Sequence, residues 1–206
     1  MLRWPLLLLL AALLPMQPAV LTSGLATGVA DGPTYTADGQ MKYPAGYAEW
    51  VFLGTGLDMS YSSEATPDHS MFNSVFVNPG AYKVFKSSGH WPDGTVMVLE
   101  NRGATGASSI NKRGKTESSE VMGMEIHVKD STHAKGDGWA FYGFADPADR
   151  KSAGKLIARG ASCYTCHEAH GAVDTTFVQF YPNALDVAKE KKTFSAEYLK
   201  EAAAAR

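Results

Sequence analysis

The chain has 206 residues, a formal net charge of −2, two cysteines and 19% charged residues. Its length suits one domain, and its charge balance provides no basic surface of the kind that binds nucleic acid. A hydrophobic content of 45% excludes a disordered chain, and two cysteines are too few for a disulfide scaffold.

The first 26 residues predict a signal peptide. Arg3 supplies a positive charge, and residues 6–14 form an uncharged apolar run. This run is too short to cross a bilayer and is typical of the apolar part of a signal peptide. Residues 24–26 fit a cleavage site, with Ala30 as a second candidate. We therefore expect a periplasmic or otherwise exported protein with no membrane span after cleavage.

The rest of the chain predicts a short leader and one domain. Residues 27–42 are polar and rich in Gly and Thr, which favours a loose leader with Tyr35 as a candidate anchor. Residues 43–206 contain no internal repeat and are expected to form a single haem-binding domain, for the reasons given below.

Strands are predicted through the middle of the chain. Residues 50–54 are apolar and fit a strand or a buried helical turn. Residues 71–77, 95–100 and 139–144 are rich in β-branched and aromatic side chains, and residues 122–129 alternate between apolar and polar.

Helices are predicted between and after these strands. Asn78 and Pro79 have the chemistry of a helix start, and Gly89 that of its end. Residues 147–159 and 195–206 are also expected to be helical, whereas residues 101–119 predict a long solvated loop. Together these patterns predict an α+β fold with an antiparallel β-sheet core and short helices.

The segment Cys163-Tyr164-Thr165-Cys166-His167 has the Cys-x-x-Cys-His pattern of c-type haem attachment. Two thiols at this spacing can add to the two vinyl groups of one haem, and the adjacent histidine then donates a ring nitrogen to iron. We therefore expect one covalently attached haem c near the C-terminus. Cys163, Cys166 and His167 would bind it, and His167 would be the metal ligand.

Three other uses of the motif compete with haem attachment. A thioredoxin-like redox pair is expected early, after the first strand of an alternating βα pattern. Zinc would need further ligands, and the chain has no other cysteine. A plain disulfide leaves His167 unexplained. Haem attachment accounts for all three residues.

The region after the motif offers no clear sixth ligand to the iron. The last methionine, Met124, precedes the motif, and His170 follows His167 too closely to reach the far side of the ring. A helical-bundle cytochrome c′ also has a late motif, but it needs long helices that residues 71–144 do not offer. The sequence therefore favours an open, five-coordinate iron on a sheet scaffold.

A series of short motifs resembles the cytochrome P-460 family, including its cytochrome c′-beta relatives. The motifs occur in order from about Tyr43 to Pro182: Tyr47-x-x-Trp50-Val51 with Gly54-Thr55, Val77-x-Pro79-x-x-Tyr82, Gly89-x-x-x-Asp93-Gly94-Thr95-Val96, Gly123-x-Glu125-x-x-Val128-Lys129-Asp130, Trp139-Ala140-Phe141, the haem motif, and Asp174-x-x-Phe177-x-x-Phe180-Tyr181-Pro182. The resemblance implies a dimeric, sheet-dominated haem protein with an open distal site. It also implies nitrogen chemistry, because cytochrome P-460 members oxidise hydroxylamine with nitric oxide chemistry along the way.

One position departs from the family. In cytochrome P-460 members a lysine forms an extra covalent bond to the haem, and the matching position here is Leu99, followed by Glu100. No lysine occurs between Lys86 and Lys112. Leucine cannot form the bond, so the resemblance moves toward the cytochrome c′-beta members, which bind nitric oxide and lack the cross-link. Leu99 is expected to line the haem pocket.

Glu125 matches a pocket glutamate that is thought to move protons in the family, which makes it the candidate catalytic residue. A carboxylate beside a haem pocket can act as a general base; from the residues alone, a solvated strand face is the simpler interpretation. By alternation His127 shares the face of Glu125 and lies either inward or at the rim. Phe72, Phe76 and Met97 fit either the distal wall or core packing.

These observations lead to one hypothesis and two alternatives. The hypothesis is an exported mono-haem c-type cytochrome with five-coordinate iron that binds or converts nitric oxide or related small nitrogen ligands, with an electron donor or acceptor protein as partner and a homodimer as its candidate assembly. The first alternative is an enzyme that oxidises hydroxylamine or uses peroxide. The second is an electron-transfer cytochrome, with a distal ligand from Met71, Met97, Met122, Met124 or His127.

Overall fold

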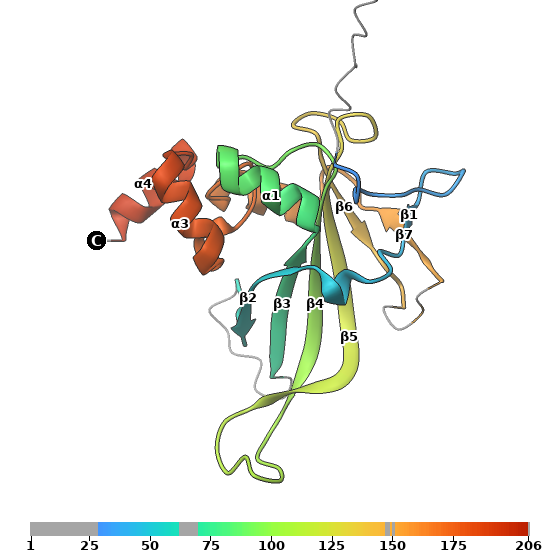
Figure 1. The fold of residues 1–206 in the computed structure, drawn as a ribbon, viewed down its shortest axis with the longest axis vertical. Helices are drawn as coiled ribbons and strands as arrows, with labels where there is room; N and C mark the ends of the chain where they lie inside the picture. Colours follow the sequence, from blue (N-terminus) through green and yellow to red (C-terminus); the bar gives the residue numbers. More distant parts are fainter. Residues whose placement is uncertain (1–28, 62–69, 147–148, 150, 206) are drawn as a thin grey trace, which may run out of the picture.

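The computed structural model describes residues 29–61, 70–146, 149 and 151–205 (Figure 1). The predicted signal peptide lies outside them. The strands are β1 (Met41–Lys42), β2 (Val51–Leu57), β3 (Met71–Val77), β4 (Thr95–Thr105), β5 (Thr116–Lys129), β6 (Trp139–Gly143) and β7 (Ala153–Leu156). The helices are α1 (Pro79–Ser88), α2 (Ser162–His170), α3 (Pro182–Lys191) and α4 (Ala196–Ala204), with short 3-10 helices η1 (Tyr47–Glu49) and η2 (Val178–Phe180).

The strands form one antiparallel sheet in the order β1-β7-β6-β5-β4-β3-β2. The helices gather beside one face of this sheet (Figure 1). Both the antiparallel core and the short helices were predicted, so the α+β fold class is confirmed. None of the helices in the described part of the chain combines the length and the apolar character needed to cross a bilayer.

Side chains alternate along β5 as its sequence predicts. Met124, Ile126 and Val128 are buried on one face, and Glu125 and His127 point to the other. Because successive side chains of a strand point to opposite sides, each face of the sheet can carry its own core.

The two cores have different partners. The core on the helical side joins sheet residues such as Met97 to Phe85 and Trp91, and includes small residues of α3. The opposite core joins Ile126 to Met41 and other residues that precede β2. The candidate site described below lies on the helical side.

The predicted leader makes specific contacts with the domain. Met41 is 1% exposed and pairs with β7, and Tyr35 donates a hydrogen bond to Asp130. An Asp31 carboxylate oxygen accepts the N–H of Gly80 at the start of α1. Asn78 is the N-cap residue of this helix and Pro79 lies in its first turn, as predicted, but the Asn78 side chain makes no capping bond; its oxygen accepts the N–H of Val96 instead. Residues 29–42 are therefore tied to the domain more closely than a loose leader would be.

Two segments differ from their predicted structure. Within residues 147–159, expected to be helical, the described part contains the strand β7 and no helix. Gly154 suits this strand because a Cβ there would lie 2.6 Å from the Phe144 ring. Of residues 101–119, expected to be a loop, residues 101–105 and 116–119 instead extend β4 and β5 into a long hairpin, and residues 106–115 connect the two strands. The added part of β5 is largely exposed and that of β4 is half-buried, so cross-strand pairing such as Thr105 with Thr116 forms the hairpin without an apolar pattern.

Candidate haem site

The predicted haem motif lies on α2. Cys163, Cys166 and His167 are three and four residues apart, so the helix places them on one face. Both cysteines are free thiols and partly buried. Tyr164 lies between them and is buried, where its hydroxyl accepts the N–H of Phe141 and donates to a backbone carbonyl. These two hydrogen bonds fix α2 to β6 and to the chain just after β7.

The ring of His167 has a defined orientation. Its Nδ1 lies 2.7 Å from the carbonyl oxygen of Thr175. Because a carbonyl only accepts, Nδ1 carries the proton and Nε2 keeps its lone pair. Burial lowers the pKa of His167, which favours the neutral ring, the form that binds a metal. The ring packs 4.1 Å from that of Phe177 and 4.8 Å from that of Phe141, measured between centroids.

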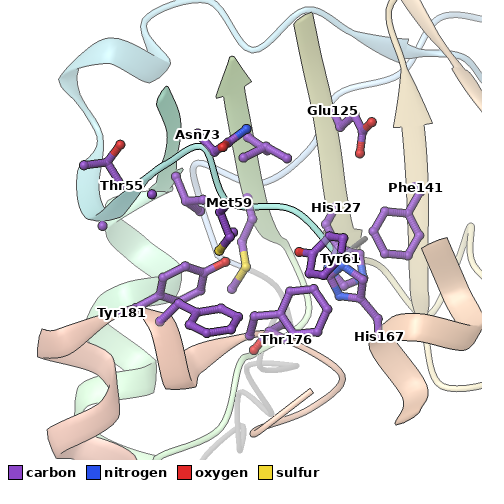
Figure 2. Close-up of a pocket in the computed structure, with 17 residues that line it drawn as sticks. Thr55, Met59, Tyr61, Asn73, Glu125, His127, Phe141, His167, Thr176 and Tyr181 are labelled. Atoms are coloured by element: carbon purple, nitrogen blue, oxygen red, sulfur yellow. The ribbon is translucent and has the colours of Figure 1, made fainter. Parts of the chain in front are cut away.

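A cavity of about 290 Å³ borders His167. Figure 2 shows its wall, formed by side chains of β3, β4, β5 and β6 on one side and by aromatic residues near η2 on the other. Leu99 and Glu125, both predicted at the site, are direct cross-strand neighbours and both line it. Met97 and His127 form the next cross-strand pair, nearer to His167.

The two polar residues of β5 that line the cavity lie at different depths. Glu125 is exposed, whereas His127 is 7% exposed. The His127 ring stacks on Phe141 at 4.0 Å between centroids, with 5° between the planes. Its Nε2 is buried and has no hydrogen-bond partner among the described residues. Burial first, and then the neighbouring His167, lower the pKa of His127 well below its ordinary range, so its ring is neutral at pH 7. The sequence left open whether His127 lies inward or at the rim; in the structure its side chain points inward, into the cavity wall.

The other residues considered for the distal wall or as distal ligands lie on different faces of the sheet. Met97 lines the cavity, whereas Met124 belongs to the opposite core and Met122 is half exposed. Phe76 also packs on the opposite side, 5.7 Å from Tyr47 between ring centroids. Of the methionines considered as distal ligands, Met97 is thus the one that lines the cavity.

Sequence reasoning missed several lining residues. Met59 and Tyr61 follow β2 in a polar stretch without periodicity, so no signal marked them. Phe177, Phe180 and Tyr181 were noted only as part of a family motif, although their aromatic spacing before α3 was a usable signal. His170 lies outside the cavity, where its Nδ1 is 3.0 Å from a carboxylate oxygen of Glu201 on α4.

These donors fit a haem. Two thiols share a helix face with a neutral imidazole whose Nε2 carries the lone pair, and the cavity beside His167 is lined mainly by apolar and aromatic side chains. Among the described residues, no group of three or more His, Cys, Asp and Glu side chains comes close enough together to hold a bare metal ion. The zinc alternative therefore lacks its ligands in this part of the chain.

Gly171 is expected to be sensitive to substitution, because it lets the chain after α2 approach His167. A Cβ there would lie 2.6 Å from the backbone oxygen of His167 and 2.6 Å from the backbone of Thr175. Since backbone cannot move aside cheaply, we expect Gly171→Ala to lower the free energy of unfolding by about 1–3 kcal/mol, measured by urea denaturation. Gly160→Ala is the control, because nothing lies within 4 Å of its Cβ position. Equal stability of the two variants would contradict this packing.

Comparison with known proteins gives a family assignment. No curated protein matches the chain. The family model described as Cytochrome P460 matches residues 44–178, about two thirds of the sequence. This stretch contains the cysteine motif, Leu99, Glu125 and His127, and it agrees with the resemblance found in the sequence. The chain therefore belongs to the cytochrome P460 family of haem-binding cytochromes.

Proposed function

We propose that this chain is an exported mono-haem c-type cytochrome whose five-coordinate iron binds nitric oxide or a related small nitrogen ligand. The observation that supports the proposal is the common face of α2, which groups two thiols with a neutral His167, and His167 itself lines a largely apolar cavity. When bound, the haem would supply an iron atom that His167 would coordinate and that could bind a small ligand.

Each residue of the site has a role in this proposal. Cys163 and Cys166 would hold the haem through thioether bonds, and His167 would bind iron through Nε2. Leu99 would keep the cavity wall apolar and free of a cross-link. Glu125, at the exposed end of the same wall, would hold or move a proton at its carboxylate.

The optical spectrum of the ferrous protein tests the proposal. We expect a high-spin, five-coordinate spectrum without added ligand and a clear change when nitric oxide is added. A ferrous spectrum that is already low-spin would instead support the electron-transfer alternative, with Met97 or His127 as the distal ligand because both line the cavity. Comparison with Met97→Leu and His127→Phe would then identify which side chain binds.

An enzymatic role is favoured by one observation, the position of Glu125 directly opposite Leu99 in the cavity wall. If the protein turns over hydroxylamine or peroxide with Glu125 as general base, Glu125→Gln should lower the rate about 100-fold or more. The measurement is steady-state turnover with each substrate. Glu120→Gln is the matched control, because Glu120 is an exposed residue of the same strand and does not line the cavity. An unchanged rate in Glu125→Gln removes Glu125 from the mechanism.

A further inference from the structure

The turn that supplies the carbonyl partner of His167 has an unfavourable backbone. Val173 and Thr176 exchange backbone hydrogen bonds across it. The two central residues, Asp174 and Thr175, have φ of +46° and +55°. Positive φ at both central positions is the pattern of a type I′ turn, which favours Asn-Gly. A β-branched residue such as Thr175 rarely adopts it, so contacts outside the turn must stabilise it.

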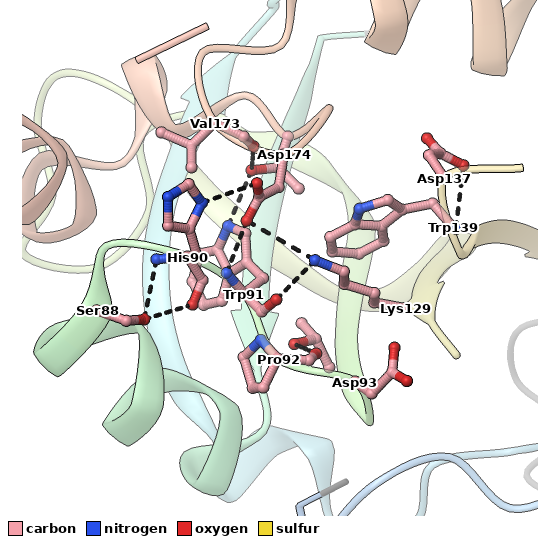
Figure 3. Close-up of polar contacts among 12 residues, drawn as sticks. Ser88, His90, Trp91, Pro92, Asp93, Lys129, Asp137, Trp139, Val173 and Asp174 are labelled. Atoms are coloured by element: carbon pink, nitrogen blue, oxygen red, sulfur yellow. Dashed lines mark hydrogen bonds and ion pairs between the residues drawn. The ribbon is translucent and has the colours of Figure 1, made fainter. Parts of the chain in front are cut away.

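The carboxylate of Asp174 makes such contacts (Figure 3). Its Oδ1 lies 3.0 Å from Nδ1 of His90, and its Oδ2 accepts the N–H of Trp91 at 2.8 Å. The ammonium of Lys129 lies 3.9 Å from Oδ2 and also donates to the carbonyl of Trp91. His90 and Trp91 lie in the connection from α1 to β4, and Lys129 ends β5. The Asp174 carboxylate therefore joins the turn both to this connection and to the end of β5.

A second bond holds the far end of the turn. The indole N–H of Trp91 donates to the hydroxyl of Thr176 at 3.0 Å, and both residues are 1% exposed. Trp91 is itself stacked on Phe85, with 3.9 Å between ring centroids. Thr175 lies between Asp174 and Thr176 in the chain, and both of these residues form hydrogen bonds with Trp91. The position of the Thr175 carbonyl is therefore held from both sides by one buried tryptophan.

We propose that Asp174 is a positioning residue for the axial ligand His167. By holding the strained turn, its carboxylate keeps the Thr175 carbonyl at hydrogen-bond distance from Nδ1 of His167. That bond sets the tautomer and orientation of the ring and increases the donor strength of Nε2. The inference rests on the proposed function, in which His167 binds iron.

Asp174→Ala in the haem-loaded full chain tests the role of the carboxylate. Without it the turn relaxes and the bond to Nδ1 weakens, so Nε2 becomes a poorer donor. We expect the iron–histidine stretching band of the ferrous protein, measured by resonance Raman spectroscopy, to shift to lower frequency, and the reduction potential to rise. An unshifted band and potential would overturn the proposal.

Asp130→Ala is the matched control. The Asp130 carboxylate is similarly shielded, with 16% side-chain exposure against 19% for Asp174, and it lies 2.9 Å from Nδ1 of a different histidine, His133. It accepts no hydrogen bond from the turn. We expect the iron–histidine band and the reduction potential of Asp130→Ala to match those of the unmodified protein. An equal shift in Asp130→Ala would mean general loosening and would overturn the proposal.

A rescue variant distinguishes the effect of the turn conformation from that of the Asp174 charge. Asp174→Asn combined with Thr175→Gly gives the pair that type I′ turns prefer, so the turn should form without the carboxylate. We expect the band of this double variant to return to its original position, and a shifted band would overturn the proposal. The double variant decides the question even if Asp174→Ala yields no loaded protein. Absence of an iron–histidine band in the unmodified protein would instead contradict the proposed function itself.

Discussion

Replacing both Cys163 and Cys166 with serine is expected to abolish covalent haem attachment. The two thiols share one face of α2 with His167, and both are free. Serine has a similar size but cannot form a thioether bond. The measurement is the mass of the denatured protein, which should lose the mass of one haem, together with loss of the haem stain on a denaturing gel. Each single variant should keep denaturation-resistant haem through the remaining thioether bond.

Two further variants test the assignment of roles in the motif. Thr165→Ala is the control, because Thr165 is exposed and its hydroxyl donates to the Ser162 carbonyl of its own helix. His167→Ala should keep the covalent haem and change its spectrum, since in the proposed site the thiols would attach the ring and the imidazole would bind iron. Denaturation-resistant haem in the double serine variant would mean that another side chain forms the covalent bond.

The sequence could predict the parts of the site that follow from spacing. A helix places residues three and four apart on one face, so the spacing of Cys163, Cys166 and His167 is enough to group them. Alternation along a strand placed Glu125 on the face of His127, and the family resemblance added Leu99. These predictions depend only on local geometry and motif position. In the structure Leu99, Glu125 and His127 line the same cavity as His167.

The parts that could not be predicted depend on contacts between distant segments. The Thr175 carbonyl is a backbone atom and has no sequence signature, although it sets the tautomer of His167. Burial of His127 requires Phe141 on the neighbouring strand. The strand β7 forms because two other strands accept it as a partner, which outweighs the weak helical preference of its own residues.

Glu100→Ala is expected to cost about 3 kcal/mol of unfolding free energy. The Glu100 side chain is 6% exposed and receives hydrogen bonds from Arg102 through Nε at 2.5 Å and Nη2 at 3.0 Å. The buried hydroxyl of Tyr47 donates to the same carboxylate. Without the carboxylate, the Arg102 guanidinium and the Tyr47 hydroxyl lose their shared acceptor. Both groups stay shielded from water, so the free energy that it cost to desolvate them is no longer offset by these hydrogen bonds. Urea denaturation followed by circular dichroism measures the loss, with Glu120→Ala as the exposed control.

The neighbouring position makes this prediction informative about the site. Leu99 and Glu100 are adjacent in sequence, but the strand sends Leu99 to the cavity and Glu100 to the opposite side with Tyr47. We therefore expect Glu100→Ala to lower stability while the ferrous spectrum and its response to nitric oxide stay unchanged. An altered spectrum in the folded variant would show that the acidic residue beside position 99 acts on the cavity. If stability falls and the spectrum holds, this carboxylate supports the strand that carries the cavity wall.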